Sequence, residues 1–235
     1  TSAIVKRISN RSISANRKRN IFIVLTIALA SALLSAIVLY GFGVMQETQN
    51  RNQKTAQIMY HAISEQQGQE LYKQEEIAWV GEFFNAFSEQ VNHSTVNFTY
   101  ANADMLKSQS MPYSGDLPAS ENEIVVQESF LDSLGYSNEL GQTIQIPFSD
   151  GTTHDFKLTG ILDVKTGDIG RYTAIISKEL VRQQYGDEGM IDYYIGLKGA
   201  QNMSEEEATN YANTLAQQLK ISDDNVIVRS TYFNL

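Results

Sequence analysis

The feature that most constrains this chain is an uninterrupted apolar run near its N-terminus, IFIVLTIALASALLSAIVLYGFGVM, at Ile21–Met45. None of these 25 residues carries a charge. An α-helix needs about 20 such residues to cross the hydrocarbon core of a bilayer. A helix that is apolar on every face is rarely buried in a domain of this size. The sequence therefore predicts one transmembrane helix over residues 21–45.

A cleaved signal peptide is the alternative explanation for an apolar run in this place. The apolar part of a signal peptide usually has about 7–15 residues, followed by small residues at the cleavage site. Here the run is longer, and 20 residues precede it. An uncleaved membrane anchor is therefore favoured. The first residue is Thr1 rather than Met, which predicts that the sequence begins within a longer chain or after processing.

The charges divide the chain into two environments. The whole chain has 18 Lys and Arg, 27 Asp and Glu, and a net charge of −9. Residues 1–45 hold no acid and six cations, which are Lys6, Arg7, Arg11, Arg17, Lys18 and Arg19. Residues 46–235 therefore hold 12 cations and all 27 acids, a net charge of −15. This acidic body excludes nucleic acid as a partner, because phosphate contacts need clustered Lys and Arg.

The same asymmetry predicts the orientation of the membrane helix. Lys and Arg are retained on the cytoplasmic side of a membrane. Residues 1–20 are therefore expected to be a cytoplasmic basic segment at the plasma membrane, and residues 46–235 to be extracytoplasmic. Ile4, Val5, Ile8 and Ile13 are interleaved with the cations, a pattern typical of an amphipathic helix on membrane lipid. A disordered basic tail is the alternative.

Small residues recur at every fourth position of the apolar run. Ala28, Ala32 and Ala36 have this spacing, and Ser31 and Ser35 lie beside them. Small residues so spaced let another membrane helix approach closely. These five residues are therefore helix-packing candidates, although alanine is also simply common in membrane helices.

Two strand–helix–strand patterns lie at the ends of the outer body. In each, the helix begins with a Ser that is followed three residues later by Gln or Glu, the spacing of a capping box. The two pairs are Ser64 with Gln67 and Ser204 with Glu207. The expected strands are 55–63, 77–91, 191–198 and 225–233. Two such units commonly pair into a split βαβ sheet with the helices on one face.

The middle of the body is less regular. A segment with two prolines and a glycine, at 111–120, breaks the pattern. The expected elements around it are strands 96–105, 123–126, 142–148, 154–163 and 172–177 and helices 127–134 and 178–185. We predict an α+β fold in which residues 109–188 form an inserted β-rich subdomain. One continuous α+β domain is the alternative.

No group of residues points to catalysis, a cofactor or a metal. His61, His93 and His154 lie in three segments without paired spacing, and the chain has no cysteine. The sequence lacks a nucleophile elbow, a zinc-peptidase motif, a phosphate loop and a dinucleotide fingerprint. We therefore expect no catalytic residue, no cofactor and no metal site, and an enzyme ranks third among the function classes.

Three segments of the sequence resemble permease subunits of ABC transporters of the FtsX/MacB type. Ser9–Thr26 is similar to the basic segment that leads into the first membrane helix of that family. Tyr113–Leu134, YSGDLPASENEIVVQESFLDSL, resembles the family run with G-x-LP and NEI, continued by Gly135 and Gly141–Ile146. Phe156–Leu162, FKLTGIL, resembles the strand that follows. The order of these features carries the resemblance.

The resemblance implies a permease with four membrane helices and a large extracytoplasmic domain between the first two. It implies a porter-like split βαβ subdomain, here 46–108 and 189–235, with the smaller insert at 109–188. It also implies a dimer with a second permease copy or paralogue, and a separate cytoplasmic ABC ATPase whose motion reaches the outer domain. The sequence ends at Leu235, where the family continues into its second membrane helix, so either a fragment or a single-span protein is expected.

Two functions of different classes follow. The first is a permease fragment whose outer domain transmits motion or handles an amphiphilic substrate such as a peptide, drug or lipoprotein. The alternative is a single-span membrane-anchored binding or sensor module. Further apolar runs of about 20 residues after Leu235 would indicate the permease.

The topology can be tested with a protease. We expect Arg17, Lys18 and Arg19 to be cytoplasmic and the chain from Glu47 onward to be outside, because of the charge asymmetry. Protease added to intact cells should digest residues 46–235 and spare residues 1–20, whereas both should be digested in permeabilised cells. Protection of residues 46–235 in intact cells would contradict the orientation.

Overall fold

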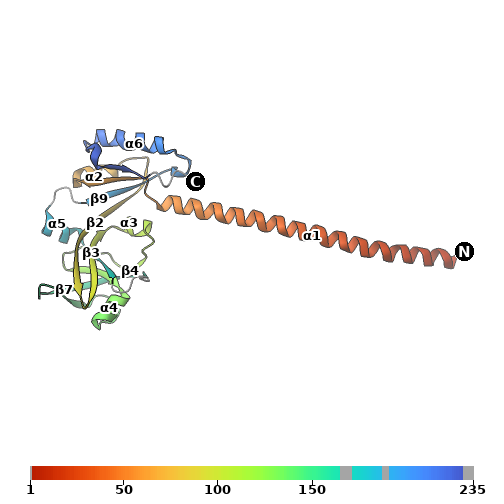
Figure 1. Cartoon of the computed structure of the whole chain (residues 1–235), viewed down its shortest axis with the longest axis horizontal. Coiled ribbons are helices and arrows are strands. Elements are labelled where there is room, and N and C mark those ends of the chain that lie inside the picture. Colours follow the sequence, from red (N-terminus) through yellow and green to blue (C-terminus); the bar gives the residue numbers. More distant parts are fainter. Residues whose placement is uncertain (1, 165–170, 187–190, 230–235) are drawn as a thin grey trace. The chain divides into compact units, whose positions relative to one another are not determined.

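The computed structural model describes residues 2–164, 171–186 and 191–229, which form two units, 1–50 and 51–235 (Figure 1). The first unit lies in helix α1, Ser2–Lys54, which continues beyond the apolar run through the polar residues 46–54. Among the described helices, α1 alone has a stretch long and apolar enough to cross a membrane, Asn16–Val44. The hydroxyl of Thr26 donates to the carbonyl of Phe22 at 2.8 Å, which satisfies a polar group within the apolar stretch.

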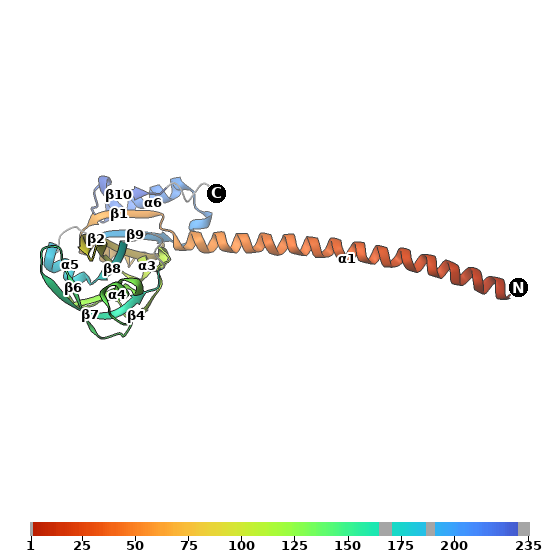
Figure 2. The same cartoon turned by 60° about the horizontal axis from the view of Figure 1, so that its bottom comes forward.

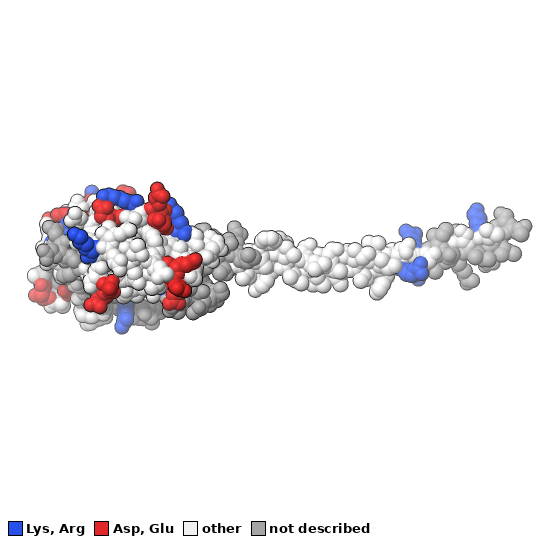
Figure 3. Space-filling model, turned by 90° about the horizontal axis from the view of Figure 1, so that it is seen from above, with Lys and Arg blue, Asp and Glu red and all other residues white. Residues whose placement is uncertain are grey.

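Figure 3 shows cations near the N-terminal end of α1, followed by a stretch of this helix without charged residues. The acidic residues drawn in red lie on the second unit. Each unit taken by itself therefore shows its part of the charge asymmetry: the first unit has cations near its N-terminal end, and the second unit has the acidic residues drawn in red.

The second unit is built on a mixed sheet. Its strands are β1 (Ile58–Ile63), β2 (Ile77–Val91), β3 (Ser94–Ala101), β4 (Tyr113–Gly115), β5 (Glu123–Gln127), β6 (Thr143–Pro147), β7 (Thr153–Leu162), β8 (Arg171–Ile176), β9 (Ile191–Leu197) and β10 (Val226–Val228). Its helices are α2 (Glu65–Leu71), α3 (Ala103–Ser108), α4 (Glu128–Leu134), α5 (Lys178–Tyr185) and α6 (Glu205–Gln218), with short 3-10 turns at Ala200–Asn202 and Asp223–Asn225. The strand order is β10-β1-β9-β2-β3-β8-β5-β7-β4, and β6 pairs with β7.

The first four strands in this order confirm the predicted split βαβ arrangement. Strand β1 lies antiparallel between β10 and β9, and β9 lies antiparallel to β2. The units β1-α2-β2 and β9-α6-β10 therefore interlock, each with a strand of the other between its own two (Figure 2). Helices α2 and α6 pack on one face, where Leu71 and Ala212 join a buried cluster with Ile58 and Tyr60. The Tyr60 hydroxyl donates to the Ala212 carbonyl at 2.9 Å.

The capping residues act as predicted. Both capping boxes form, Ser64 with Gln67 and Ser204 with Glu207. The hydroxyl of Ser177 accepts a hydrogen bond from the first turn of α5, as its position before that helix predicts. Gly135 ends α4 in the left-handed region with φ 80°, a backbone conformation that glycine adopts at little cost.

Three of the predicted boundaries were wrong or incomplete. Strand 96–105 ends at Ala101, because the Asn102 side chain accepts from the Met105 amide at 3.0 Å and so begins α3. Strand β4 forms inside the segment 111–120 that was expected to be only a break. The last strand is described over Val226–Val228, and residues 230–233 of the predicted 225–233 strand lie outside the described residues, as do residues 187–190.

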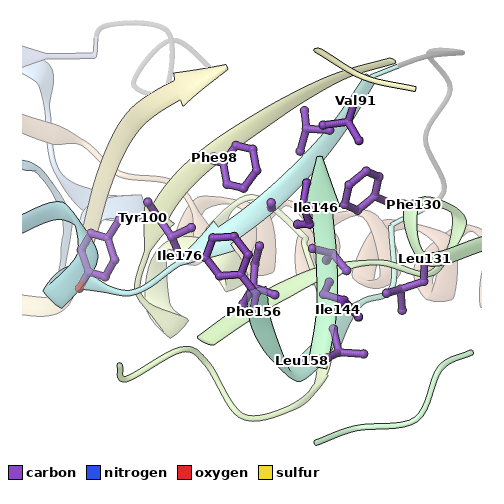
Figure 4. Packing of buried hydrophobic residues seen from close by; sticks show 14 of the residues in the cluster. Val91, Phe98, Tyr100, Phe130, Leu131, Ile144, Ile146, Phe156, Leu158 and Ile176 are labelled. Atoms are coloured by element: carbon purple, nitrogen blue, oxygen red, sulfur yellow. The ribbon is translucent and has the colours of Figure 1, made fainter. Parts of the chain in front are cut away.

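The strands of 109–188 extend the same sheet instead of forming a sheet of their own. The join is a parallel pairing of β3 with β8 over Thr95–Tyr100 and Arg171–Ile176. The strands of 109–188 nevertheless pack into a buried cluster that is distinct from the cluster beneath α2 and α6 and gathers around Phe98, Phe130 and Phe156 (Figure 4). This cluster also takes residues of β2 and β3. The subdomain boundaries 46–108, 109–188 and 189–235 remain a prediction.

A glycine in α2 makes the packing of this helix testable. A β-carbon at Gly68 would overlap the ring of Tyr193, which is fully buried at 0% exposure. We expect Gly68→Ala to destabilise the outer unit by about 1–3 kcal/mol from overpacking, although alanine favours helices. The melting temperature of the full chain in detergent should fall by several degrees.

The control is Gln66→Ala, an exposed position in the same helix, which should leave the melting temperature unchanged. A Gly68→Ala variant as stable as this control would show that α2 does not pack closely on Tyr193.

Candidate functional site: the helix anchor and the charged junction

The predicted packing stripe lies on α1. Ala28, Ala32 and Ala36 are exposed, as are Ser31 and Ser35 beside them. Positions four apart in an α-helix differ by about 40° around its axis, so the three alanines follow one side of α1. The structure therefore places the five residues together on a free helix face, and their role in contact with another helix stays a prediction.

The three histidines lie far apart in the sequence and do not form a site. His61 Nδ1 lies 2.7 Å from Asp192 Oδ1 on the surface. His93 occupies the β2–β3 turn with φ 67°, and His154 Nε2 lies 3.0 Å from Thr152 Oγ1. Within the described ranges, no three or more His, Asp or Glu side chains are grouped so that they could hold a metal ion.

The structure reveals an anchor that the sequence did not indicate, at Gln57. Gln57 follows the end of α1 by three residues and is 2% exposed. Its amide donates to the Ile195 carbonyl at 2.9 Å, and its carbonyl accepts from the Arg229 amide at 3.0 Å. Its side-chain Oε1 accepts from the Leu197 amide at 2.8 Å, and Nε2 donates to the Thr55 carbonyl at 2.6 Å.

These bonds tie the segment after α1 to β9 and to the chain that leaves β10. A buried glutamine with both ends of its side chain hydrogen-bonded holds a fixed position, because leaving either end unpaired would cost desolvation energy. The one sequence signal was a polar residue ahead of the apolar positions of 58–63, and it is too common a pattern to predict an anchor.

A second group of side chains forms a charged junction between α5, α2 and β2. Lys178 of α5 lies 2.9 Å from Glu82 of β2 and 3.3 Å from Glu65 of α2, measured from Nζ to Oε1. Arg182, one turn further along α5, also contacts the Glu65 carboxylate. The Glu82 side chain is only 8% exposed and that of Lys178 19%. We call these four residues the charged junction.

The electrostatics of the junction follow from these contacts. Burial opposes the ionisation of Glu65, but the charges and hydrogen bonds of Lys178 and Arg182 outweigh burial and lower the pKa of this carboxyl. The Tyr100 hydroxyl donates to Glu82 Oε2 at 2.8 Å. Burial, followed by the Glu82 carboxylate, raises the pKa of Tyr100, so Tyr100 stays neutral and keeps donating to that carboxylate.

The junction joins the two halves of the outer unit. Helix α5 lies within 109–188, whereas α2 and β2 lie within 46–108, and the two sets of residues also share the β3–β8 pairing. Sequence reasoning missed all four residues, because the partners are distant in the chain: Glu65 and Arg182 are 117 positions apart. These four charged side chains can hold α5, α2 and β2 in a fixed arrangement or transmit a displacement from one to another. They do not bring a nucleophile together with a base.

The comparisons with known proteins agree with this architecture. Residues 21–215 match the family model of the MacB-like periplasmic core domain. The periplasmic region of MacB from Actinobacillus actinomycetemcomitans has 12% identity and a TM-score of 0.51, covering 73% of this chain and 86% of that chain. The extracellular domain of the noncanonic ABC-type transporter YknZ from Gram-positive bacteria has 10% identity and a TM-score of 0.51, covering 74% and 98%. No curated protein matches the sequence.

The anchor can be tested by Gln57→Leu. This change keeps a similar volume but removes both side-chain hydrogen bonds and leaves the Leu197 amide unpaired. We expect a loss of about 1–3 kcal/mol in stability and faster hydrogen exchange at the Leu197 amide. Gln145→Leu, an exposed position in β6, is the matched control. Unchanged exchange at Leu197 would show that Gln57 is not an anchor.

The junction can be tested by a double-mutant cycle. Lys178→Met leaves the buried Glu82 carboxylate without its cation, which should cost about 3 kcal/mol. Lys178→Met combined with Glu82→Gln removes the unpaired charge while keeping an acceptor for Tyr100, so most of that loss should be recovered.

Denaturant unfolding of the full chain in detergent measures Lys178→Met, Glu82→Gln and the double variant. The matched control is Lys73→Met, because the contact of Lys73 with Glu70 is exposed and such pairs contribute about 0–1 kcal/mol. Simple addition of the two single losses would contradict a direct interaction between Lys178 and Glu82.

Proposed function

This chain belongs to the family of MacB-like periplasmic core domains, and we propose that it carries the motion of a membrane helix into an extracytoplasmic domain of an ABC-transporter permease. Domains of this family are components of transporter permeases. Such permeases generally dimerise and associate with an ABC ATPase. The candidate membrane helix and the mixed-sheet domain fit that architecture. The transmission of helix motion, the partners and the orientation in the membrane are what we propose for this chain.

The observation that carries the proposal is the position of Gln57. It follows α1 by three residues, and its hydrogen bonds reach β9 and the end of β10. A displacement of the end of α1 would therefore act on two strands of the split βαβ sheet at once. From there the continuous sheet and the charged junction lead to the half that holds β5, β7 and β8.

The partners follow from the same proposal. A cytoplasmic ABC ATPase supplies the energy, and a second permease copy or paralogue packs against Ala28, Ala32 and Ala36. Residues 1–20 lie on the cytoplasmic face, where their cations and apolar residues contact membrane lipid, and residues 46–235 lie outside. The outer domain acts by movement or by handling an amphiphilic substrate such as a peptide, drug or lipoprotein, without a catalytic step, a cofactor or nucleic acid.

Hydrogen exchange tests the transmission role. The native membrane protein, isolated together with its cytoplasmic ATPase, is compared with and without ATP. We expect ATP to change amide exchange in β1 and β9 beside Gln57, because the anchor couples these strands to α1. Isolation of the protein without any ATPase, or exchange in β1 and β9 that does not respond to ATP, would favour the single-span binding or sensor module.

The stripe on α1 gives a separate prediction for assembly. Ala32→Phe should weaken association with the second permease copy at least tenfold, since close helix contact tolerates little added volume. Ala30→Phe is the matched control, because residue 30 lies about 200° from residue 32 around the helix. Analytical ultracentrifugation in detergent measures both variants.

The histidines give a further prediction. His61→Gln, His93→Gln and His154→Gln should leave activity unchanged, and loss of activity in a folded histidine variant would favour a catalytic or metal role.

A further inference from the structure

The outer unit has a sheet face with several uncharged polar side chains that neither the anchor nor the junction uses. In β3, Val96, Phe98 and Tyr100 belong to the buried cluster, so the alternate residues Asn97 and Thr99 face the other side of the sheet. Register places Asn85 of β2 opposite Thr99 and Thr173 of β8 opposite Asn97. These four side chains, Asn85, Asn97, Thr99 and Thr173, form the polar floor.

A pocket of about 230 Å³ opens over the polar floor. Its apolar wall is made by Met105 and Leu106 of α3 and by Met111 after this helix, and Phe83, Ala101 and Ile175 of the sheet also line the pocket. Residues of the floor and the wall therefore meet in one pocket with a polar base and an apolar side. No Lys, Arg, Asp, Glu or His is among the described residues that line it.

The polar floor has hydrogen-bonding capacity to spare. Thr99 is only 6% exposed and lines the pocket, and its hydroxyl has no hydrogen-bond partner among the described side chains and backbone. Asn97 Oδ1 accepts from the Ser88 hydroxyl at 2.7 Å, which leaves the amide nitrogen of Asn97 available. The Thr99 hydroxyl is not among the fully buried unpaired atoms of the described residues, so it reaches the pocket, where a ligand or solvent can bond it.

We propose that this pocket binds an uncharged peptide segment, with one apolar side chain against the wall and its flanking amides on the polar floor. Each peptide amide has one donor and one acceptor, and hydroxyl and carboxamide groups supply both. A charged group would be disfavoured, because no opposite charge compensates its desolvation. Methionine side chains adapt to differently shaped apolar partners, so Met105 and Met111 accept more than one kind of side chain.

The size of the pocket sets the extent of the ligand. Sites for drug-sized molecules have about 300–1,000 Å³, so this pocket holds one side chain with its amides rather than a whole drug or acyl chain. The assignment rests on the proposed permease role and narrows its amphiphilic substrate to a peptide.

Methyl NMR of the full chain in lipid nanodiscs tests the site, with N-acetyl-Ala-Leu-Ala-amide as the probe. We expect saturable shifts of the Met105 and Met111 methyl signals. Thr99→Val removes one hydroxyl without changing the shape and should weaken binding about fivefold. Thr173→Phe places a large ring on the polar floor, which should fill part of the pocket and weaken binding more than tenfold. Thr143→Val and Thr143→Phe, at an exposed position in β6, are matched controls that should bind as the unaltered chain does.

Several results would overturn the assignment. They are the absence of saturable shifts, unchanged affinity in both Thr99→Val and Thr173→Phe, or tighter binding of N-acetyl-Ala-Lys-Ala-amide or of an uncharged N-acetylated oligosaccharide. The ATP-dependent exchange beside Gln57 is measured on the same variants. If peptide binding is lost while the ATP-dependent exchange is intact, only the pocket assignment fails. If that exchange is lost while peptide binding is intact, only the transmission role fails.

Discussion

The architecture of the outer unit depends on strand β2, because this one strand pairs with β9 of the split βαβ half and with β3, which joins the other half through β8. Its first part, from Ile77 to Phe83, pairs with β9, and its second part, from Phe83 to Val91, pairs with β3. The register shifts between Asn85 and Phe87, where a bulge bends a strand and increases its twist. The helix-covered split βαβ half and the half that holds β5, β7 and β8 therefore share a continuous backbone ladder, and neither can rotate far without bending β2.

The elements that the sequence predicted correctly are those determined by neighbouring residues. Capping boxes at Ser64 and Ser204 need partners within a few positions, so their patterns sufficed to place the starts of α2 and α6. Asn102 shows the limit of this reasoning. Its carboxamide accepts from the Glu82 amide as well as the Met105 amide, both at 3.0 Å, and a tertiary partner of this kind leaves no local pattern.

The charged junction and the polar floor could not be predicted, because both need the strand order. The parallel pairing of β3 with β8 brings Thr173 beside Asn97, and it also positions α5 so that Lys178 meets Glu82. Alternation in β3 alone indicates one polar face, without showing which strands continue it. Residues 46–235 have a net charge of −15, yet the described residues that line the pocket on this sheet face are all uncharged. Solubility does not account for this, because charged residues would serve solubility equally well.

A buried glutamine at the start of the sheet has a physical advantage over an apolar residue when a helix pulls on it. An apolar side chain packs without a fixed direction, so a strand held only by such contacts could slip along its neighbours. A slip of one residue in β1 would turn Ile58 and Tyr60, both 0% exposed, to the opposite face of the sheet. The bonds from Gln57 to Leu197 and Ile195 are directional and fix the register of β1 against β9. Force arriving from α1 would then move the sheet as a body instead of sliding one strand, which is the property that transmission requires.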